Sequence, residues 1–384
     1  MPWKQVPYAI WTDLGGTEMN RYGWEYTETD LWRVGEYPGI SLYHVFGLLT
    51  TKRHTTLAFC EAREGNGGDA GCMHHLFMRR STDGGRTFEE NTVLVKAAEN
   101  TCFGNPTPVQ DTDTGRIFLF YADNTENRRT DVYVMTSDDE GVSWSDPKRV
   151  TDCFGDAQPF HLPGPGHGIY LKTDSIPGRL LMPVWHRSHG VDVPALQRGY
   201  CTSVLTSDDH GETWKNSACV GYSAYLSETR IAQVKDADGK DALELQGRNI
   251  DMPVRCHMRS TDGGMTWTEP VPMNVEKANV CDAGILSFSD GGKMKNALLV
   301  SRVSSLEKRR DMEILISLDG GAHYEMKFHL PPGDAIPGYS DLTLLEEGVV
   351  GLLHVRSDHV LFSRISLETL TNGWYSGTRR SVWL

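Results

Sequence analysis

The sequence predicts an all-β protein, a six-bladed β-propeller of four-stranded antiparallel sheets, and three observations carry that prediction. One eight-residue pattern, S-x-D-x-G-x-T-W, recurs five times, strand-like runs lead into its copies, and no 12-residue stretch shows a convincing helical stripe. The copies occupy residues 81–88, 137–144, 207–214, 260–267 and 317–324, and the last has lost the threonine. Five copies, with unmatched strand-rich sequence at both ends of the chain, favour six blades.

The repeated pattern is typical of a hairpin turn, here called an Asp-box. The aspartate accepts hydrogen bonds from the turn backbone, the glycine supplies a positive φ, and the aromatic side chain packs beneath the corner. The strand-like runs lie at residues 76–78, 131–135, 202–205 and 312–316, so each repeat unit is predicted to be a small antiparallel sheet. We expect the boxes to be scaffold and their aromatic residues to anchor the core.

Length and charge exclude several classes of protein. The chain of 384 residues carries 51 acidic and 38 basic residues, and its formal net charge of -13 disfavours binding to nucleic acid or to an anionic membrane. It contains no apolar run of about 18 residues that could span a bilayer, and residues 1–13 do not read as an export signal. We therefore expect one domain over residues 1–384, favour the cytoplasm over secretion, and expect residues 1–40 to close the propeller or form a rim.

The eight cysteines are scattered without a CxxC pair, and they read as mostly buried free thiols. The histidine spacings fit no common zinc pattern. The sequence therefore predicts no metal and no cofactor.

Longer segments between the boxes carry a more specific signal. They lie at residues 61–69, 104–106, 114–118, 164–169, 178–185, 338–342 and 348–353. With the boxes, they make the chain resemble the sialidase (neuraminidase) family of exo-glycosidases. The resemblance implies a retaining glycoside hydrolase that releases a terminal α-linked sialic acid, or a related acidic nonulosonic sugar, from glycans through a tyrosyl-glycosyl intermediate.

By this resemblance, three residues would carry the chemistry. Tyr339, in a Gly-Tyr-Ser-Asp segment, would be the nucleophile, and Glu228 would take its phenolic proton. A tyrosine suits this reaction because an anionic nucleophile would be repelled by the carboxylate on the anomeric carbon. Asp69, in a glycine-rich loop, would be the general acid, with Glu64 as a nearby competitor.

The family also binds the sugar carboxylate with three arginines, because guanidinium groups grip both oxygens. By position, Arg248 and Arg309 fit two of them, with Arg310 as the fallback for Arg309, and Arg63 is a further pocket candidate. Where the family has the first arginine this chain has His44, and Val355 stands where the family has the glutamate that holds that arginine. The loss of both residues indicates a pocket with altered specificity rather than an inactive one. Losing both partners of a buried ion pair can leave the stability of the protein nearly unchanged.

Two other functions stay open at this point. A propeller glycosidase acting on a neutral sugar such as arabinose would be indifferent to the loss of Arg248 or Arg309. A non-catalytic glycan-binding propeller would bind without turnover, and Tyr339 would then affect no rate.

Overall fold

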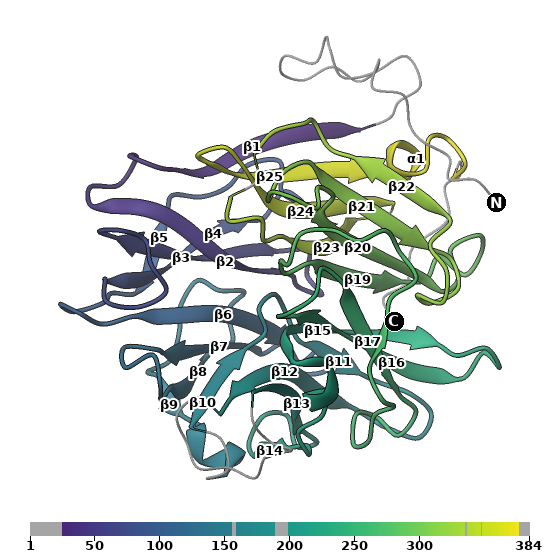
Figure 1. Ribbon diagram of the computed structural model, residues 1–384, viewed down its shortest axis with the longest axis horizontal. Coiled ribbons are helices and arrows are strands. Elements are labelled where there is room, and N and C mark those ends of the chain that lie inside the picture. The colour runs from purple at the N-terminus through teal and green to yellow at the C-terminus, as the bar shows by residue number, and fades with distance from the viewer. Residues whose placement is uncertain (1–24, 156–158, 189–198, 335, 347, 376–384) are drawn as a thin grey trace.

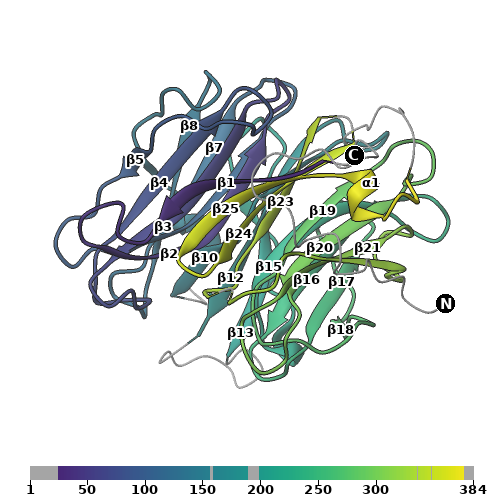
Figure 2. The ribbon, with the colours of Figure 1, turned by 90° about the horizontal axis from the view of Figure 1, so that it is seen from above.

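Six antiparallel sheets follow one another around a ring in the computed structural model of the protein, so the predicted all-β propeller is confirmed (Figure 1). The structure describes residues 25–155, 159–188, 199–334, 336–346 and 348–375. Strands β2, β6, β15, β19 and β23 lie toward the middle of the ring, and Figure 2 shows the same sheets from above. The first strand of each blade is thus placed to present residues along the central axis.

The first three blades run from β2 to β14. Blade one consists of β2 (Ile40–Thr50), β3 (Thr56–Glu64), β4 (His74–Ser81) and β5 (Thr92–Val95). Blade two consists of β6 (Phe103–Gln110), β7 (Ile117–Asp123), β8 (Asp131–Ser137) and β9 (Lys148–Arg149). Blade three consists of β10 (Phe160–Pro163), β11 (Ile169–Leu171), β12 (Arg179–Arg187), β13 (Tyr200–Ser207) and β14 (Lys215–Asn216).

The other three blades run from β15 to the end of the ring. Blade four consists of β15 (Leu226–Lys235), β16 (Asp241–Asn249), β17 (Arg255–Ser260) and β18 (Val271–Pro272). Blade five consists of β19 (Gly284–Phe288), β20 (Ala297–Val303), β21 (Met312–Ser317) and β22 (Met326–His329). Blade six consists of β23 (Asp341–Glu346), β24 (Val349–Arg356), β25 (His359–Ser366) and β1 (Tyr26–Arg33).

Blade six takes its fourth strand from the other end of the chain. Strand β1 pairs antiparallel with β25, and Tyr26 lies opposite Ile365. Trp32, at the end of β1, is fully buried and stacks on Tyr43 of blade one. The N-terminal segment therefore ties the last blade to the first, while Trp3, Trp11 and Trp24 lie outside the described residues.

Blade three departs from the four-stranded pattern because its inner strand is split. Strands β10 and β11 both pair with β12, and residues 164–168 cross between them. There Gly166 donates its N–H to the carbonyl of Phe46 in blade one, 3.0 Å away. Its φ is +90°, and a Cβ on it would overlap the guanidinium of Arg230, so this close approach of the backbone requires glycine.

The Asp-boxes form the expected turns at the corners of the blades. In the box of blade three, Asp209 accepts hydrogen bonds from the backbone N–H of Thr213 and from the hydroxyls of Ser207 and Thr213. The aromatic residues pack across blade boundaries, as Trp144 does against Phe59 at a centroid distance of 6.1 Å. The boxes are therefore scaffold that seals neighbouring blades.

Little of the described chain is helical. The helices are α1 (Leu367–Leu370) and the 3-10 turns η2 (Thr151–Phe154) and η4 (Tyr222–Ala224). Within the described residues, none is long and apolar enough to cross a membrane. All eight cysteines are free thiols.

Three buried histidines make stability depend on pH. Burial lowers the pKa of His44 well below its usual value, that of His161 to about 2 and that of His354 to about 4. In the unfolded chain each takes up a proton near pH 6.5, so stability falls as pH falls below that value. From pH 7.5 to 5.5 we expect the free energy of unfolding to drop by about 4 kcal/mol through these groups.

Urea unfolding of the native chain and of His354→Gln at the two pH values checks this expectation. The variant keeps a polar partner for Ser363, whose hydroxyl contacts His354 Nε2 at 2.8 Å. It should lose about 1 kcal/mol less than the native chain over the same interval. An identical pH dependence in both proteins would show that His354 does not contribute.

Candidate active site

A cavity of about 260 Å³ brings together all seven residues that the sequence singled out. Blade one contributes His44, Arg63 and Asp69 from β2, β3 and the loop after β3, and the others come from blades four, five and six. These are Glu228, Arg248, Arg309 and Tyr339. Residues far apart in the chain therefore meet on the propeller axis, and none of the five Asp-boxes lines this cavity.

Tyr339, Glu228 and Arg248 form the centre of the site. The Tyr339 hydroxyl donates a hydrogen bond to Glu228 Oε1. Arg248 Nη1 lies 2.7 Å from Glu228 Oε2 and 3.3 Å from the Tyr339 oxygen. The guanidinium thus pairs with the carboxylate while it also faces the phenol, where negative charge would develop if the proton moved to Glu228.

The buried phenol of Tyr339 keeps its proton at neutral pH. Burial raises the pKa of Tyr339 well above its usual value, and the neighbouring Glu228 charge raises it further, while Arg248 opposes both. The proton can therefore leave only as the oxygen forms a new bond, and the carboxylate to receive it is already in contact. This arrangement has the geometry of a nucleophile with its base.

Two β-bulges aim side chains into the cavity. One interrupts the pairing of β2 with β3 between His44 and Phe46, and the other interrupts β15 and β16 between Ser227 and Thr229. The bulged backbone has φ of 43° at Val45 and 44° at Glu228. Valine and glutamate rarely adopt a positive φ, so the surrounding packing must maintain this strained backbone. Strained backbone of this kind is concentrated at functional sites.

His44 is held as one neutral tautomer beside the phenol. Its Nδ1 accepts the backbone N–H of Val45 at 2.7 Å, so the proton resides on Nε2. The ring meets the Tyr339 ring edge to face, with 4.5 Å between centroids. Burial lowers the His44 pKa well below its usual value, and the charge of Arg63 adds to this. His44 therefore supplies one uncharged donor.

Asp69 lies at the mouth of the cavity. Its side chain is 82% exposed and accepts a hydrogen bond from Arg63 Nη1 at 2.8 Å. Burial acts to raise the Asp69 pKa, but the Arg63 charge and hydrogen bond outweigh it and the pKa is lowered. Arg63 is held from below by Glu61, whose Oε2 lies 2.6 Å from Nη2. Arg63 thus positions the carboxylate that faces solvent.

The sequence left two alternatives open, Arg309 or Arg310 and Asp69 or Glu64, and in each case the structure places only the first residue at the cavity. Arg309 lines the cavity, with Nη1 on the Pro337 carbonyl at 2.7 Å and its guanidinium carbon 5.8 Å from the Tyr339 ring centroid. Arg310 is exposed and pairs with Asp311 instead. Glu64, the competitor of Asp69, pairs with His75 and does not line the cavity. Within the described residues, Arg309 contacts no carboxylate, so its charge is available to a ligand.

One wall of the cavity consists of residues that the sequence did not predict for the site. Phe160, Trp185 and Tyr200 form a chain of aromatic contacts, and Arg187 lies over the Phe160 ring at 4.0 Å. Asn105, which also lines the cavity, and Trp185 lie in two segments that resemble the sialidase family. Phe160, Arg187 and Tyr200 lie at strand positions outside these segments, where the sequence showed no sign of a binding site. Aromatic rings thus form part of the cavity wall, and the Arg187 guanidinium packs on one of them.

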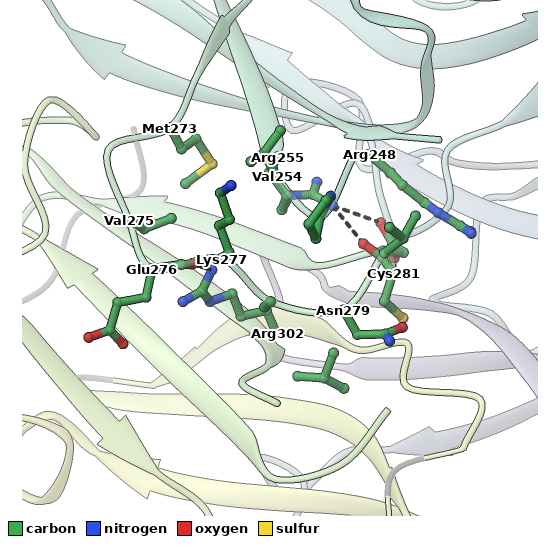
Figure 3. A pocket seen from close by; sticks show the side chains of 15 residues that line it. Arg248, Val254, Arg255, Met273, Val275, Glu276, Lys277, Asn279, Cys281 and Arg302 are labelled. Atoms are coloured by element: carbon green, nitrogen blue, oxygen red, sulfur yellow. Dashed lines mark hydrogen bonds and ion pairs between the residues drawn. The ribbon is translucent and has the colours of Figure 1, made fainter. Parts of the chain in front are cut away.

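Arg248 also lines a second cavity, between blades four and five (Figure 3). This cavity holds only about 20 Å³, which is room for a water molecule but not for a sugar. Arg255 and Cys281 lie on its wall (Figure 3), which Asp282 also lines. It is too small for a sugar, so the cavity around Tyr339 is the candidate site.

Comparison with known proteins identifies the family. The model of the BNR repeat-like domain family matches residues 78–355. A sialidase of Micromonospora viridifaciens is 28% identical over 376 residues, covering 90% of this chain and 54% of that protein. A sialidase of Bacteroides fragilis is 25% identical over 358 residues, covering 85% of this chain and 62% of that protein. The chain thus spans between half and two thirds of the length of these curated relatives.

Solved structures show the same architecture. The Hadza microbial sialidase Hz136 superposes with a TM-score of 0.76 at 26% identity, covering 87% of this chain and 67% of that one. The leech intramolecular trans-sialidase superposes with a TM-score of 0.74, covering 90% of this chain and 71% of that one; at 19% identity it shows the fold alone. With the family match over most of its length, the chain belongs to the sialidase family of BNR-repeat proteins, built on a six-bladed propeller.

Proposed function

We propose that this protein is an exo-acting, retaining glycoside hydrolase that removes a terminal α-linked sialic acid, or a related acidic nonulosonic sugar, from glycans. The observation that carries the proposal is the Tyr339 hydroxyl donating to Glu228 beside Arg248, in a cavity with Asp69 at its mouth. The sialidases of similar sequence support it. A cavity closed at its base suits one terminal sugar rather than an internal segment of a glycan.

In the first step Tyr339 attacks the anomeric carbon. As the new carbon–oxygen bond forms, the phenolic proton passes to Glu228 and Arg248 stabilises the charge shared by the two groups. The glycosidic carbon–oxygen bond breaks, and its oxygen leaves with the proton of Asp69. The product of this step is a sugar bound covalently to Tyr339.

In the second step Asp69 acts as a base. It removes a proton from a water molecule, which attacks the same carbon and displaces the Tyr339 oxygen. Glu228 returns the proton to the phenol, so the site is restored. Two displacements at one carbon leave its configuration unchanged.

Asp69 must be protonated before the first step, and its neighbour Arg63 does not favour that state. Arg63 lowers the Asp69 pKa while the side chain faces water. A glycan that covers the mouth of the cavity would remove this water, and desolvation raises the pKa of a carboxyl group. Binding of the leaving group would thereby favour the protonated form of Asp69, which is the form that the first step requires.

The charge distribution favours an acidic sugar over a neutral one. The carboxylates of Glu228, Glu61 and Asp69 neutralise Arg248 and Arg63, but Arg309 bonds only to backbone carbonyls among the described residues. Arg309 is half-buried, so a bound sugar would cover a cation that has no carboxylate partner, and the site therefore favours a ligand that supplies the anion. A sugar carboxylate would do so, and the neutral Nε2–H of His44 would add one further hydrogen bond.

The test is hydrolysis of a fluorogenic α-sialoside, followed by proton NMR of the released sugar in the first minutes. Turnover with the α-anomer as the first product would establish a retaining sialidase. If the β-anomer appears first, water attacks directly and the covalent step is wrong. If no acidic glycoside turns over, a screen of neutral glycosides and a binding titration would distinguish the two remaining functions.

The substitution His44→Arg probes the position where the family has an arginine. By the family pattern the added guanidinium would face Val355 rather than a glutamate, and an unpaired buried charge costs about 3 kcal/mol of stability. The double variant His44→Arg/Val355→Glu should recover that loss. It should also lower KM for a sialoside by about tenfold, because a charge-assisted bond replaces a neutral one.

Thermal unfolding and steady-state kinetics of the single and double variants check this expectation. Recovery of stability without a change in KM would mean that His44 does not face the sugar carboxylate. The double variant could instead lose as much stability as the single one. In that case residues 44 and 355 do not form the ion pair that the family pattern implies.

A further inference from the structure

We propose that Arg230 is a positioning residue that holds the nucleophile Tyr339 in contact with its base Glu228. This inference rests on the proposed function, and it concerns a residue below the cavity that touches no substrate. Arg230 is 2% exposed, lies two residues after Glu228 on β15, and does not line the cavity. All three nitrogen atoms of its guanidinium donate hydrogen bonds within the protein.

Two of those bonds reach the segment that follows the nucleophile. Nη2 donates to the Ser340 carbonyl at 2.9 Å, and Nη1 donates to Asp341 Oδ1 at 3.0 Å. Tyr339 itself precedes β23 and has no strand partner of its own. The Arg230 guanidinium therefore binds the two residues directly after Tyr339. Arg230 itself lies on the same strand as Glu228, β15.

The remaining bonds fix the guanidinium itself. Nε donates to Asp282 Oδ1 at 3.2 Å, and Nη2 also contacts Asp282 Oδ2. Arg255 lies on the other side of Asp282, with 3.9 Å between Nη1 and Oδ1. Asp282 thus receives the fork of Arg230 on two oxygens, which fixes the plane and direction of the guanidinium better than a single contact could.

Asp341 extends this network to the other blades. Its Oδ2 accepts the Leu48 N–H of blade one at 2.9 Å and lies 3.0 Å from His167 Nδ1 of blade three. Gly166, next to His167, leaves the space that the Arg230 guanidinium fills. Five of the six blades therefore meet at one buried ion cluster directly beneath the cavity.

A cluster of this kind is a poor way to gain stability, because burying charged groups carries a large desolvation cost. Apolar residues would close the axis at least as well. Arg230 instead fixes the relative position of the base and the nucleophile. Its hydrogen bonds join strand β15, which contains Glu228, directly to the two residues after Tyr339. A displacement of about 1 Å between reacting groups can lower a rate by about 100-fold.

The test compares three variants by their kinetics on the fluorogenic sialoside. Arg230→Met/Asp282→Asn removes the fork together with one charge of each sign, so Arg255 and Asp341 remain as the opposite charges of the cluster. Arg230→Lys keeps the charge without the fork. We expect kcat to fall by about 100-fold in the double variant and by a smaller factor in Arg230→Lys. KM should change by less than about threefold, because the substitutions leave the Arg248 and Arg309 guanidinium groups in the cavity to bind the sugar.

The third variant, Arg364→Met, is the matched control. Arg364 is also 2% exposed, bridges blades six and one through the Gly84 carbonyl, and pairs with Glu25 and Glu346 away from the cavity. It should lower the melting temperature while kcat of the folded enzyme stays unchanged. If it lowers kcat as much as the Arg230 variants do, Arg230 acts only through stability and the proposal fails.

A crystal structure of the double variant gives a readout that does not depend on activity. The proposal requires the hydrogen bond between Tyr339 and Glu228 to be lost or displaced. An intact contact, or a native kcat, would overturn it. If the double variant does not fold, Arg230→Lys decides by the same two measurements. If the native chain shows no turnover, the proposed function fails, and the structure alone decides about Arg230.

Discussion

Replacement of Tyr339 by phenylalanine should reduce turnover of an α-sialoside by at least about 1000-fold, because the reaction loses its nucleophile. The phenylalanine ring can keep the edge contact with His44 and the position under Arg309. Only the oxygen that donates to Glu228 disappears. The loss should therefore fall on kcat, while the melting temperature changes little.

Tyr43→Phe is the matched control for this variant. Tyr43 is also buried, one residue from His44 on β2, but its hydroxyl has no hydrogen-bond partner among the residues that the structure describes, and it does not line the cavity. Removing an unpaired buried hydroxyl is neutral or stabilising. Kinetics of the two variants side by side thus separate the chemistry of the phenol from the loss of a hydroxyl in the core.

Trapping provides a second measurement on Tyr339. A 2,3-difluoro derivative of the sugar should label the native enzyme, and peptide mass spectrometry should place the label on Tyr339. The phenylalanine variant should stay unlabelled. Residual turnover within about tenfold of the native rate, or a label on another residue, would remove Tyr339 from the role of nucleophile.

The Asp-boxes made the fold predictable from the sequence, because each box places a strand on either side of a turn with a known geometry. Five copies were enough to predict six blades. The split of the inner strand in blade three was not predicted. It depends on Gly166 meeting Phe46 and Arg230, and these contacts join three blades.

The candidate site was predictable where a residue type matched its chemistry within a recognisable segment, as for Tyr339 and Glu228. The bulges at Val45 and Glu228 were not, because neither carries the glycine or asparagine that usually marks a positive φ. Arg230 was missed for a related reason. An arginine in a strand reads as facing solvent, and only the carboxylates of blades five and six reveal that it is buried.

The role of Arg309 separates an acidic substrate from a neutral one. If its guanidinium binds the sugar carboxylate, Arg309→Met should lower kcat/KM on a sialoside by about 100-fold or more, since losing one partner of a buried charge pair costs about 3 kcal/mol. Steady-state kinetics should show most of this loss in KM. Turnover of any neutral glycoside that the enzyme accepts should change by much less.

Arg310→Met tests whether this effect is specific to one side chain. Arg310 is the next residue in the chain, but it is exposed and pairs with Asp311 outside the cavity. Because both substitutions remove one positive charge from the same loop, they change the long-range field of the protein almost equally. A loss in Arg309→Met alone therefore reports direct contact with the sugar. Equal losses would reduce the role of Arg309 to steering, and no loss in either variant would favour a neutral sugar as the substrate.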